Sequence, residues 1–215
     1  MRTDSIIFDL DGTLWDCSKE VAESWSVIFK QYNINRTITK EDIMGVMGLL
    51  MQDIIKQFLP NMEEKKCYEI LKICCDYEND YVSKVGGYLF PRLEETLKIL
   101  KKSYKLAIVS NCQDGYIEAF FKAHNLSQYF IDYENPGRTG LDKADNIRLV
   151  VERNKFFHPV YVGDTLSDQK SAKKAGVPFI FAAYGFGQVE EYDAKLEKFE
   201  QLPELLKKDR KKDDK

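Results

Sequence analysis

The chain has 215 residues, and its 32 Lys and Arg against 35 Asp and Glu leave a net charge of −3. This balance offers no basic surface for nucleic acid or an anionic membrane, so we expect neither as a partner. No apolar run is long enough to span a bilayer, and the first apolar segment begins too early for a signal peptide, so we expect a cytoplasmic location.

The five cysteines have no metal-ligand spacing, and their number is odd. Cys67 and Cys74 fall on one apolar helical face, which favours buried, reduced thiols. A zinc cluster of Cys74, Cys75 and Asp76 is the alternative, but it lacks the usual second pair of ligands.

The stretch from Ser5 to Leu14 begins as an apolar strand and ends in two carboxylates. The run Ile6-Ile7-Phe8 has no polar break, which is typical of a strand buried on both faces of a parallel sheet. Asp9 and Asp11 follow at the carboxyl end of this strand, where open α/β sheets bind their ligands. Two carboxylates so close repel each other unless a cation lies between them. We therefore predict a Mg²⁺ site with one carboxylate able to attack phosphorus.

From residue 16 to about residue 85 the apolar pattern is helical and contains no credible strand. Trp25 shares a helical face with other apolar residues, so we expect it in the core and not as a cofactor platform. Thr39 has the character of a helix cap, and further helices are predicted over 51–59 and 63–85. The sequence thus predicts an inserted all-helical domain over residues 16–85, which ends at Gly86-Gly87.

After residue 88 the predicted helices and strands alternate. Helices are predicted over 93–100, 117–124, 142–153 and 167–175, and strands over 106–109, 130–131, 160–162 and 179–182. This order predicts a doubly wound, Rossmann-like α/β fold with a parallel sheet, formed by residues 1–15 and 86–215.

The two histidines and the C-terminal segment belong to this half of the chain. His124 lies on an apolar helical face and is expected in the core, whereas His158 beside Pro159 is expected at the surface. A short helix is predicted over 201–208, and the charged run over 207–215 is predicted to be a solvated, frayed tail.

Polar side chains follow the later strands, as they do the first. Ser110 and Asn111 come directly after one strand, which brings a hydroxyl and main-chain N–H groups to the sheet edge of Asp9. A helix-capping role for Ser110-Asn111 is compatible with anion binding, because a helix N-terminus itself binds anions. Asp164 and Asp168 follow another strand, four residues apart.

These segments together resemble the haloacid dehalogenase superfamily of phosphohydrolases. F-D-L-D-G-T-L at 8–14, V-S-N at 109–111, Lys143 and V-G-D-T-L-S-D at 162–168 occur in the order of the family's motifs and extend over nearly the whole chain. The domain plan resembles phosphoglycolate phosphatases and β-phosphoglucomutases, in which the helical insertion is a cap over the active site. The sequence around Lys143, G-L-D-K-A-D, departs from the G-K-P of many relatives. Lys173 and Lys174, the other candidates for this motif, fit it less well.

The resemblance implies a role for each of these residues. Asp9 would be the nucleophile that becomes an aspartyl phosphate, and Asp11 the acid that protonates the leaving group and then the base that activates water. Phosphate-binding residues would be Ser110, Asn111 and Lys143. Mg²⁺ would be bound by Asp9, Asp164 and the main-chain oxygen of Asp11, while Asp168 would orient a ligand or Lys143.

The sequence therefore favours a Mg²⁺-dependent phosphatase that acts on a small phosphorylated metabolite, as a monomer or weak dimer. A phosphomutase of the β-phosphoglucomutase type shares the same motifs and is the first alternative. A non-enzymatic, receiver-like phospho-switch is the second, although receivers phosphorylate an Asp that is not on the first strand.

The segment 44–51 of the predicted cap is apolar and carries Gly45 and Gly48. Two glycines so close disfavour a helix and give a loop whose backbone can approach a ligand. We expect this loop to be the specificity loop of the cap, with hinges near 14–16 and 85–88.

Overall fold

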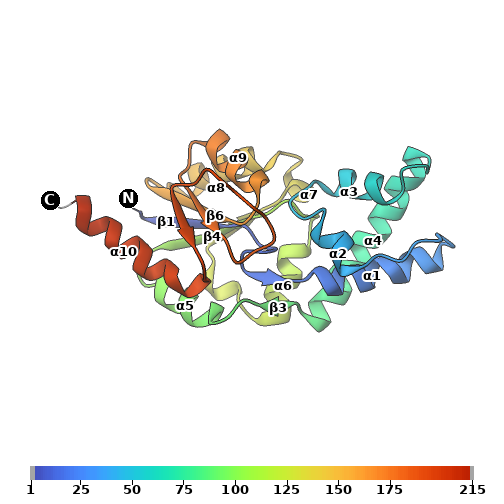
Figure 1. Cartoon of the computed structure of the whole chain (residues 1–215), viewed down its shortest axis with the longest axis horizontal. Coiled ribbons are helices and arrows are strands. Elements are labelled where there is room, and N and C mark those ends of the chain that lie inside the picture. The colour runs from blue at the N-terminus through green and yellow to red at the C-terminus, as the bar shows by residue number, and fades with distance from the viewer. Residues whose placement is uncertain (1–2, 214–215) are drawn as a thin grey trace.

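The computed structural model describes residues 3–213, with side chains up to residue 207, and its centre is a six-stranded sheet (Figure 1). The strands are β1 (Ser5–Phe8), β4 (Lys105–Val109), β5 (Asp132–Glu134), β6 (Pro159–Gly163), β7 (Phe179–Ala182) and β8 (Ala194–Leu196). They run in the order β5-β4-β1-β6-β7-β8, and every neighbouring pair is parallel. The predicted doubly wound α/β fold is confirmed.

Strand β1 is buried on both faces, as its unbroken apolar run predicts. Ile7 pairs with Ala107 of β4 on one side and with Tyr161 of β6 on the other. Ile6 and Phe8 pack into the apolar cluster on one face of the sheet, and Ile7 packs into the cluster on the opposite face. The carboxyl end of β1 is therefore held firmly at the middle of the sheet.

Helices cover both faces of the sheet. The face of Ile7 is covered by α8 (Lys143–Asn154) and α9 (Leu166–Ala175). The face of Phe8 is covered by α5 (Leu93–Leu100), α6 (Tyr116–His124) and α10 (Leu202–Asp213). The short helical turns are η1 (Ser127–Tyr129), α7 (Pro136–Thr139) and η2 (Phe199–Gln201).

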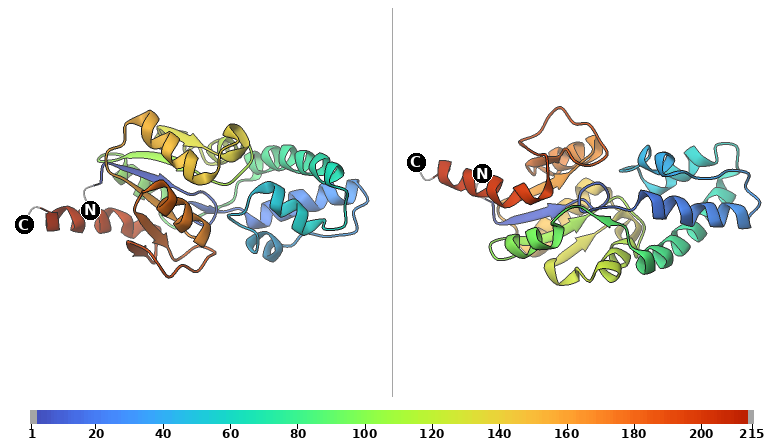
Figure 2. Two further views of the ribbon diagram at one scale, coloured as in Figure 1. Left: turned by 90° about the horizontal axis from the view of Figure 1, so that it is seen from above. Right: turned by 60° about the horizontal axis from the view of Figure 1, so that its bottom comes forward.

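A block of four helices extends from one end of the sheet, at the opposite end of the molecule from α10 (Figure 2). Its members are α1 (Ser18–Gln31), α2 (Lys40–Met44), α3 (Met51–Phe58) and α4 (Glu64–Val85). Trp25 is 1% exposed within this block, so its expected core position is confirmed. Thr39 caps α2 through a reciprocal pair of bonds with Asp42, also as predicted.

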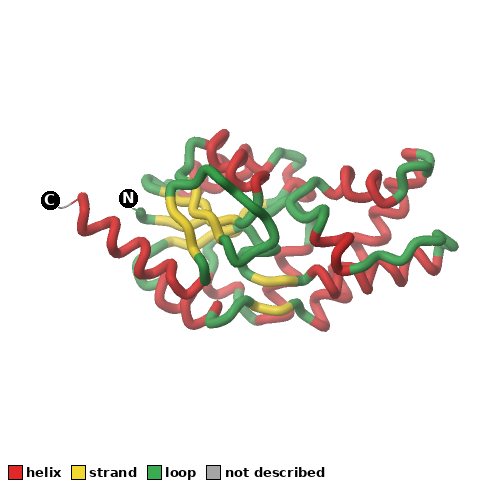
Figure 3. Tube along the Cα trace, in the orientation of Figure 1, coloured by secondary structure: helices red, strands yellow, loops and turns green. Residues whose placement is uncertain are grey.

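The two connections between the block and the sheet pair with each other, which the sequence did not predict. Strand β2 (Trp15–Asp16) and strand β3 (Tyr88–Leu89) form an antiparallel ribbon, visible as two short strands beside the main sheet in Figure 3. A Cβ at Gly87 would lie 2.9 Å from the main-chain oxygen of Asp16, so this close pairing requires glycine there. The segments predicted as hinges, 14–16 and 85–88, thus overlap one hydrogen-bonded ribbon.

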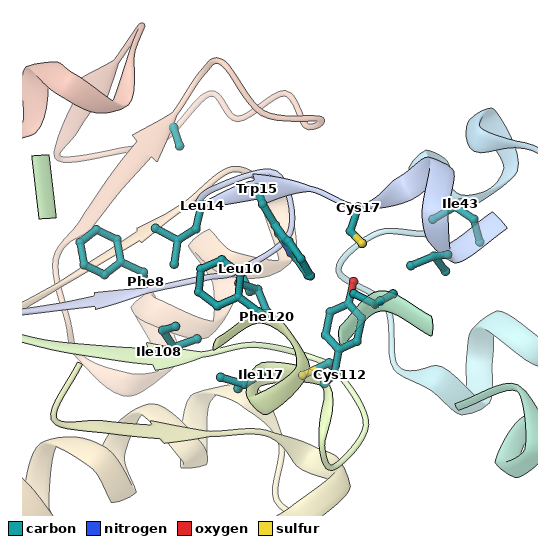
Figure 4. Packing of buried hydrophobic residues seen from close by; sticks show 14 of the residues in the cluster. Phe8, Leu10, Leu14, Trp15, Cys17, Ile43, Ile108, Cys112, Ile117 and Phe120 are labelled. Atoms are coloured by element: carbon teal, nitrogen blue, oxygen red, sulfur yellow. The ribbon is translucent and has the colours of Figure 1, made fainter. Parts of the chain in front are cut away.

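The apolar core is continuous from the sheet into the helical block. Figure 4 shows Phe8, Leu10, Leu14 and Trp15 packed above Ile117 and Phe120 of α6, with Cys17 and Ile43 on the side of the block. His124 packs edge-on against Trp15 but is half-buried, so it lies at the margin of the core and not inside it as predicted. His158 is exposed, as predicted.

Two predictions from the sequence are corrected, and one strand was missed. Strand β5 covers Asp132–Glu134 and not 130–131, because it is an edge strand whose carboxylates pair with Arg153 and so tolerate a polar sequence. Strand β8 was not predicted. Helix α10 continues past Lys208 to Asp213, so the charged run is helical up to that residue, and residues 214–215 lie outside the described residues.

The cysteines are free thiols, and Cys67 and Cys74 are buried as predicted. Cys75 is half-buried. Within residues 3–207, the side chains of Cys74, Cys75 and Asp76 do not form a group close enough to hold a metal ion. The group that does is Asp9, Asp164 and Asp168.

Candidate active site

The polar residues predicted from the sequence meet at the carboxyl edge of the sheet. Asp9 follows β1, Ser110 follows β4, and Asp164 follows β6. These three strands are neighbours in the sheet, and parallel strands bring their carboxyl ends to one edge. All three side chains are buried. The main-chain N–H of Asp9 also donates to the oxygen of Val162, which ties the end of β1 to β6.

Lys143, the first residue of α8, bridges two carboxylates at this edge. Its Nζ lies 2.8 Å from Asp9 Oδ1 and 2.6 Å from Asp168 Oδ1, and it is 2% exposed. Burial and the charge of Asp168 raise the pKa of Asp9 to about 6, although Lys143 opposes this shift. The two carboxylates raise the pKa of Lys143 above its usual range despite burial, so this lysine is a permanent cation.

Asp168 is held in place by the start of α9. Its Oδ2 accepts bonds from the main-chain N–H of Thr165, at 2.9 Å, and from the Thr165 hydroxyl, at 2.6 Å. Its Oδ1 accepts from Lys143. Because Oδ2 accepts two bonds and Oδ1 accepts from Lys143, Asp168 fixes Lys143 beside Asp9 and has little capacity left to bind a cation.

Asp164 closes the site from the other side. Its Oδ1 accepts from the Thr13 hydroxyl at 3.2 Å, and its Oδ2 accepts from the main-chain N–H of Phe186 at 2.8 Å. Burial and the charges of Asp168 and Asp9 raise its pKa well above the usual range. A Cβ at Gly12, where φ is +80°, would lie 2.2 Å from Asp164 Oδ2, so the turn after Asp11 requires glycine.

The donor set fits a hard divalent cation. Oxygens of Asp9, Asp164 and Asp168 lie within 4.8 Å of one another, buried, with Lys143 as the one buried cation among them. Three such carboxylates repel one another without further positive charge. Asp168 accepts at least three hydrogen bonds and Asp164 only two, one at each oxygen, so Asp9 and Asp164 keep more lone pairs free for a cation. Mg²⁺ in proteins is commonly bound by one or two carboxylates.

Asp11 stands apart from this cluster. It is half-buried, its Oδ1 accepts from the Tyr116 hydroxyl at 3.0 Å, and it lines a cavity between the sheet edge and the helical block. Burial and the charge of Asp9 raise its pKa well above the usual range. A carboxyl that keeps its proton beside a cavity can donate it to a group bound there.

That cavity has a volume of about 50 Å³ and lies between the two parts of the molecule. The sheet edge contributes Asp9, Asp11, Ser110, Asn111, Cys112, Gln113 and Tyr116, and the helical block contributes Val21, Trp25, Ile43, Val46, Met47, Gly48, Leu49, Met51, Ile54 and Glu78. Ser110 also bonds to Asp9, and this bond opposes the rise in the pKa of Asp9. A volume of this size is close to that of a few water molecules.

The two glycines of the predicted specificity loop differ in position. Gly48 lines the cavity at φ +81°, and its main-chain oxygen accepts a bond of 3.0 Å from Asn111 Nδ2. Gly45 ends α2 with φ −69°, is exposed, and does not line the cavity. Only Gly48 is therefore placed to act on a bound ligand.

Sequence reasoning missed several residues that shape the site. Thr13 could have been predicted from the sequence, because it directly follows D-L-D-G and its hydroxyl therefore lies at the same edge as the acids. Tyr116, Glu78 and Gln113 gave no local signal, since their contacts join segments 35 to 105 residues apart. Tyr161 donates its hydroxyl to the oxygen of Val109 at 2.7 Å and lies beside Lys143.

Fold and site together define an α/β protein with a buried acidic cluster at the carboxyl end of a parallel sheet, and the comparisons show its family. The profile of the family described as haloacid dehalogenase-like hydrolase matches residues 6–182, so the chain belongs to this family. It is therefore a hydrolase, as the motifs predicted.

Individual relatives are similar over most of their length. A phosphoglycolate phosphatase of Aquifex aeolicus is 29% identical over 84% of this chain and 85% of its own, and one of Cupriavidus necator is 25% identical over 94% and 92%. Among solved structures, a haloacid dehalogenase-like hydrolase of Streptococcus pneumoniae has a TM-score of 0.82 at 22% identity, covering 94% of this chain and 98% of its own. Such structural likeness shows the shared fold. In residues 3–213, no helix is both long and apolar enough for a membrane span.

Proposed function

We propose that this chain is a Mg²⁺-dependent phosphatase that hydrolyses a small phosphomonoester through an aspartyl phosphate on Asp9. The observation that carries the proposal is the bridge of Lys143 between Asp9 and Asp168, with Asp164 beside it and Asp11 facing the cavity. The relatives named phosphoglycolate phosphatase support the same reaction class.

The first step forms one bond and breaks another. A carboxylate oxygen of Asp9 attacks phosphorus, and the bond between phosphorus and the leaving alcohol breaks in line with the attack. Asp11 gives its proton to the departing oxygen. Lys143, fixed by Asp168, orients Asp9 and offsets charge on the phosphoryl oxygens, while Ser110 and the main chain after β4 bind those oxygens.

The second step restores the enzyme. Asp11, now ionised, takes a proton from water, the oxygen of that water attacks phosphorus, and Asp9 leaves as a carboxylate together with inorganic phosphate. Mg²⁺, bound by Asp9 and Asp164 and in our proposal also by the main-chain oxygen of Asp11, would supply positive charge to the transferring group. Helices α1–α4 exclude bulk water from the phosphoryl site.

A phosphomutase remains the alternative, and the same residues would serve it. Inorganic phosphate released in step with substrate loss supports hydrolysis, whereas an isomeric phosphomonoester formed without free phosphate supports transfer. The receiver-like switch is not carried forward, because the chain belongs to a hydrolase family. A cytoplasmic location and a monomer or weak dimer stay predictions.

The test is release of phosphate from p-nitrophenyl phosphate, acetyl phosphate and a panel of phosphorylated metabolites with Mg²⁺. We expect turnover by the wild type and its loss in Asp9→Asn, which should remain folded, because an amide does not attack phosphorus. Equal turnover by the variant contradicts the proposal.

A further inference from the structure

The cavity beside Asp11 is where the alcohol part of a substrate must lie. Asp11 can protonate the leaving oxygen only within hydrogen-bond reach, so the alcohol departs on the side of Asp11 and away from Asp9. On that side the cavity is walled by the helical block. Its residues there are chiefly apolar, namely Val21, Ile43, Val46, Met47 and Ile54.

Among the residues that line this cavity there is no Lys, Arg or His. The nearby Lys143 is committed to Asp9 and Asp168. Lys170 and Lys174 line an adjoining hollow of about 330 Å³, and Lys72 lines another of about 470 Å³. Both hollows share Asn111 with the cavity, but neither is lined by Asp11 or Glu78. An anionic group on the alcohol would therefore enter a space without a cation to pair with it, and unpaired buried charge is costly.

The one charged side chain that the helical block brings to this cavity is Glu78 of α4, and it is acidic. Glu78 is 3% exposed. Its Oε1 accepts from Gln113 Nε2 at 2.9 Å, and its Oε2 accepts from the indole N–H of Trp25. A carboxylate has about four acceptor positions, so these two bonds leave some free on a residue that lines the cavity. No cation bonds to it among the described residues.

The position of Glu78 is fixed from the core side. Gln113, just after the Ser110-Asn111 segment, also donates to Asn79 Oδ1 at 3.0 Å, and Asn79 Nδ2 donates to the main-chain oxygen of Asp114 at 2.8 Å. A Cβ at Gly115 would lie 2.7 Å from Asn79 Nδ2, so the contact of α4 with this loop is tight. Burial raises the pKa of Glu78 to about 7, and the bonds from Gln113 and Trp25 oppose the rise.

We propose that the substrate is a phosphomonoester whose alcohol part carries no anionic group and presents a hydrogen-bond donor, hydroxyl or ammonium, to Glu78. The inference rests on the proposed phosphatase activity and narrows its substrate class. It also separates this chain from its relatives named phosphoglycolate phosphatase, since the alcohol part of phosphoglycolate carries a carboxylate.

The test is a charge series of similar size: phosphoglycolate, 2-hydroxyethyl phosphate and phosphoethanolamine, each assayed for kcat/KM with Mg²⁺. We expect kcat/KM for the neutral and cationic esters to exceed that for phosphoglycolate at least about tenfold, because like charges placed together disfavour binding. Phosphoglycolate hydrolysed as well as the others, or better, overturns the inference and leaves the phosphatase proposal standing. No turnover of these three, p-nitrophenyl phosphate or acetyl phosphate overturns both.

Two pairs of variants locate the cause. Met47→Lys adds a cation to the cavity and should raise kcat/KM for phosphoglycolate, relative to that for 2-hydroxyethyl phosphate, by about tenfold. Met44→Lys adds the same charge on the exposed side of α2 and should leave this ratio unchanged. Glu78→Gln should lower kcat/KM for phosphoethanolamine relative to that for phosphoglycolate. Glu69→Gln, at an exposed position on the same helix, should leave this ratio unchanged. Identical profiles within each pair overturn the assignment of selectivity to this cavity.

Discussion

Asn111, which follows β4 of the sheet, donates a hydrogen bond of 3.0 Å to the main-chain oxygen of Gly48 in the loop between α2 and α3. The segment predicted to bind phosphate and the loop predicted to confer specificity are thus in direct contact. The loop also contacts Thr165, since a Cβ at Gly48 would lie 3.1 Å from the Thr165 hydroxyl. Thr165 in turn bonds to Asp168, so this contact reaches the residues around Lys143.

Gly48→Ala should impair hydrolysis of all phosphomonoesters. The residue has φ +81°, which disfavours a Cβ, and the added methyl presses on Thr165. This differs from the expectation from sequence, in which a bulky residue at Gly48 alters discrimination among phosphomonoesters more than turnover of a small generic substrate such as acetyl phosphate; the contact with Thr165 is the reason for the change. Gly45→Ala is the matched control, because φ there is −69° and the nearest atom to an added Cβ lies 3.4 Å away. Steady-state kinetics on three substrates check the pair, and equal behaviour of both variants would contradict the role of Gly48.

Lys143→Met should destabilise the protein by about 3 kcal/mol or more near neutral pH, because it leaves Asp9 and Asp168 buried without their cation. Urea unfolding with and without Mg²⁺ measures this. Lys174→Met is the control, since the Lys174–Asp142 pair is about half exposed on both sides and contributes at most about 1 kcal/mol. A Lys143→Met variant as stable as the control would show that the bridge does not hold the site together.

The pKa of Glu78 gives a prediction for stability against pH. Its pKa is about 7 in the folded protein against an ordinary value of 4.5, so between these values the folded state holds a proton that the unfolded state has released. Raising the pH through this window therefore destabilises the wild type relative to Glu78→Gln, by about 3 kcal/mol in total. Unfolding free energies of both proteins at pH 5 and pH 8 provide the measurement. A difference between them that does not change with pH would rule out the shifted pKa.

The sequence predicted the parallel sheet and the residues at its edge because both depend on local patterns. The apolar run before Asp9 and the position of Ser110 and Asp164 directly after strands are sufficient to place these side chains at one edge. Lys143 could be selected among 32 basic residues only by resemblance, and the structure gives it two carboxylate partners.

What the sequence could not supply depends on contacts between distant segments. The pairing of β2 with β3 involves two residues in each strand, too few for a periodic pattern. Glu78 lies on a 22-residue helix rich in charged residues, and nothing local distinguishes it from its exposed neighbours. Its burial follows from the packing of α4 against α1 and α6.

Removal of metal should abolish turnover, and Mg²⁺ should restore it where Ca²⁺ does not, because Ca²⁺ takes more oxygen ligands and would draw both oxygens of Asp9 into its sphere. Bound Mg²⁺ should also stabilise the folded protein. At a Mg²⁺ concentration about 100 times the dissociation constant, the free energy of unfolding should rise by about 2.7 kcal/mol. Asp164→Asn should lose this stabilisation, which thermal unfolding with and without Mg²⁺ detects. Equal stabilisation of wild type and variant would mean that Asp164 is not a ligand.

The most direct test of the account is to trap the phosphoenzyme. The wild type, mixed with Mg²⁺ and excess acetyl phosphate and quenched in acid during turnover, is digested, and its peptides are analysed by mass spectrometry. We predict a phosphoryl group on the peptide that contains Asp9, labile to hydroxylamine as an acyl phosphate is, and its absence in Asp9→Asn. Turnover with no phosphoryl group on Asp9, or with one on another residue, would contradict the central claim.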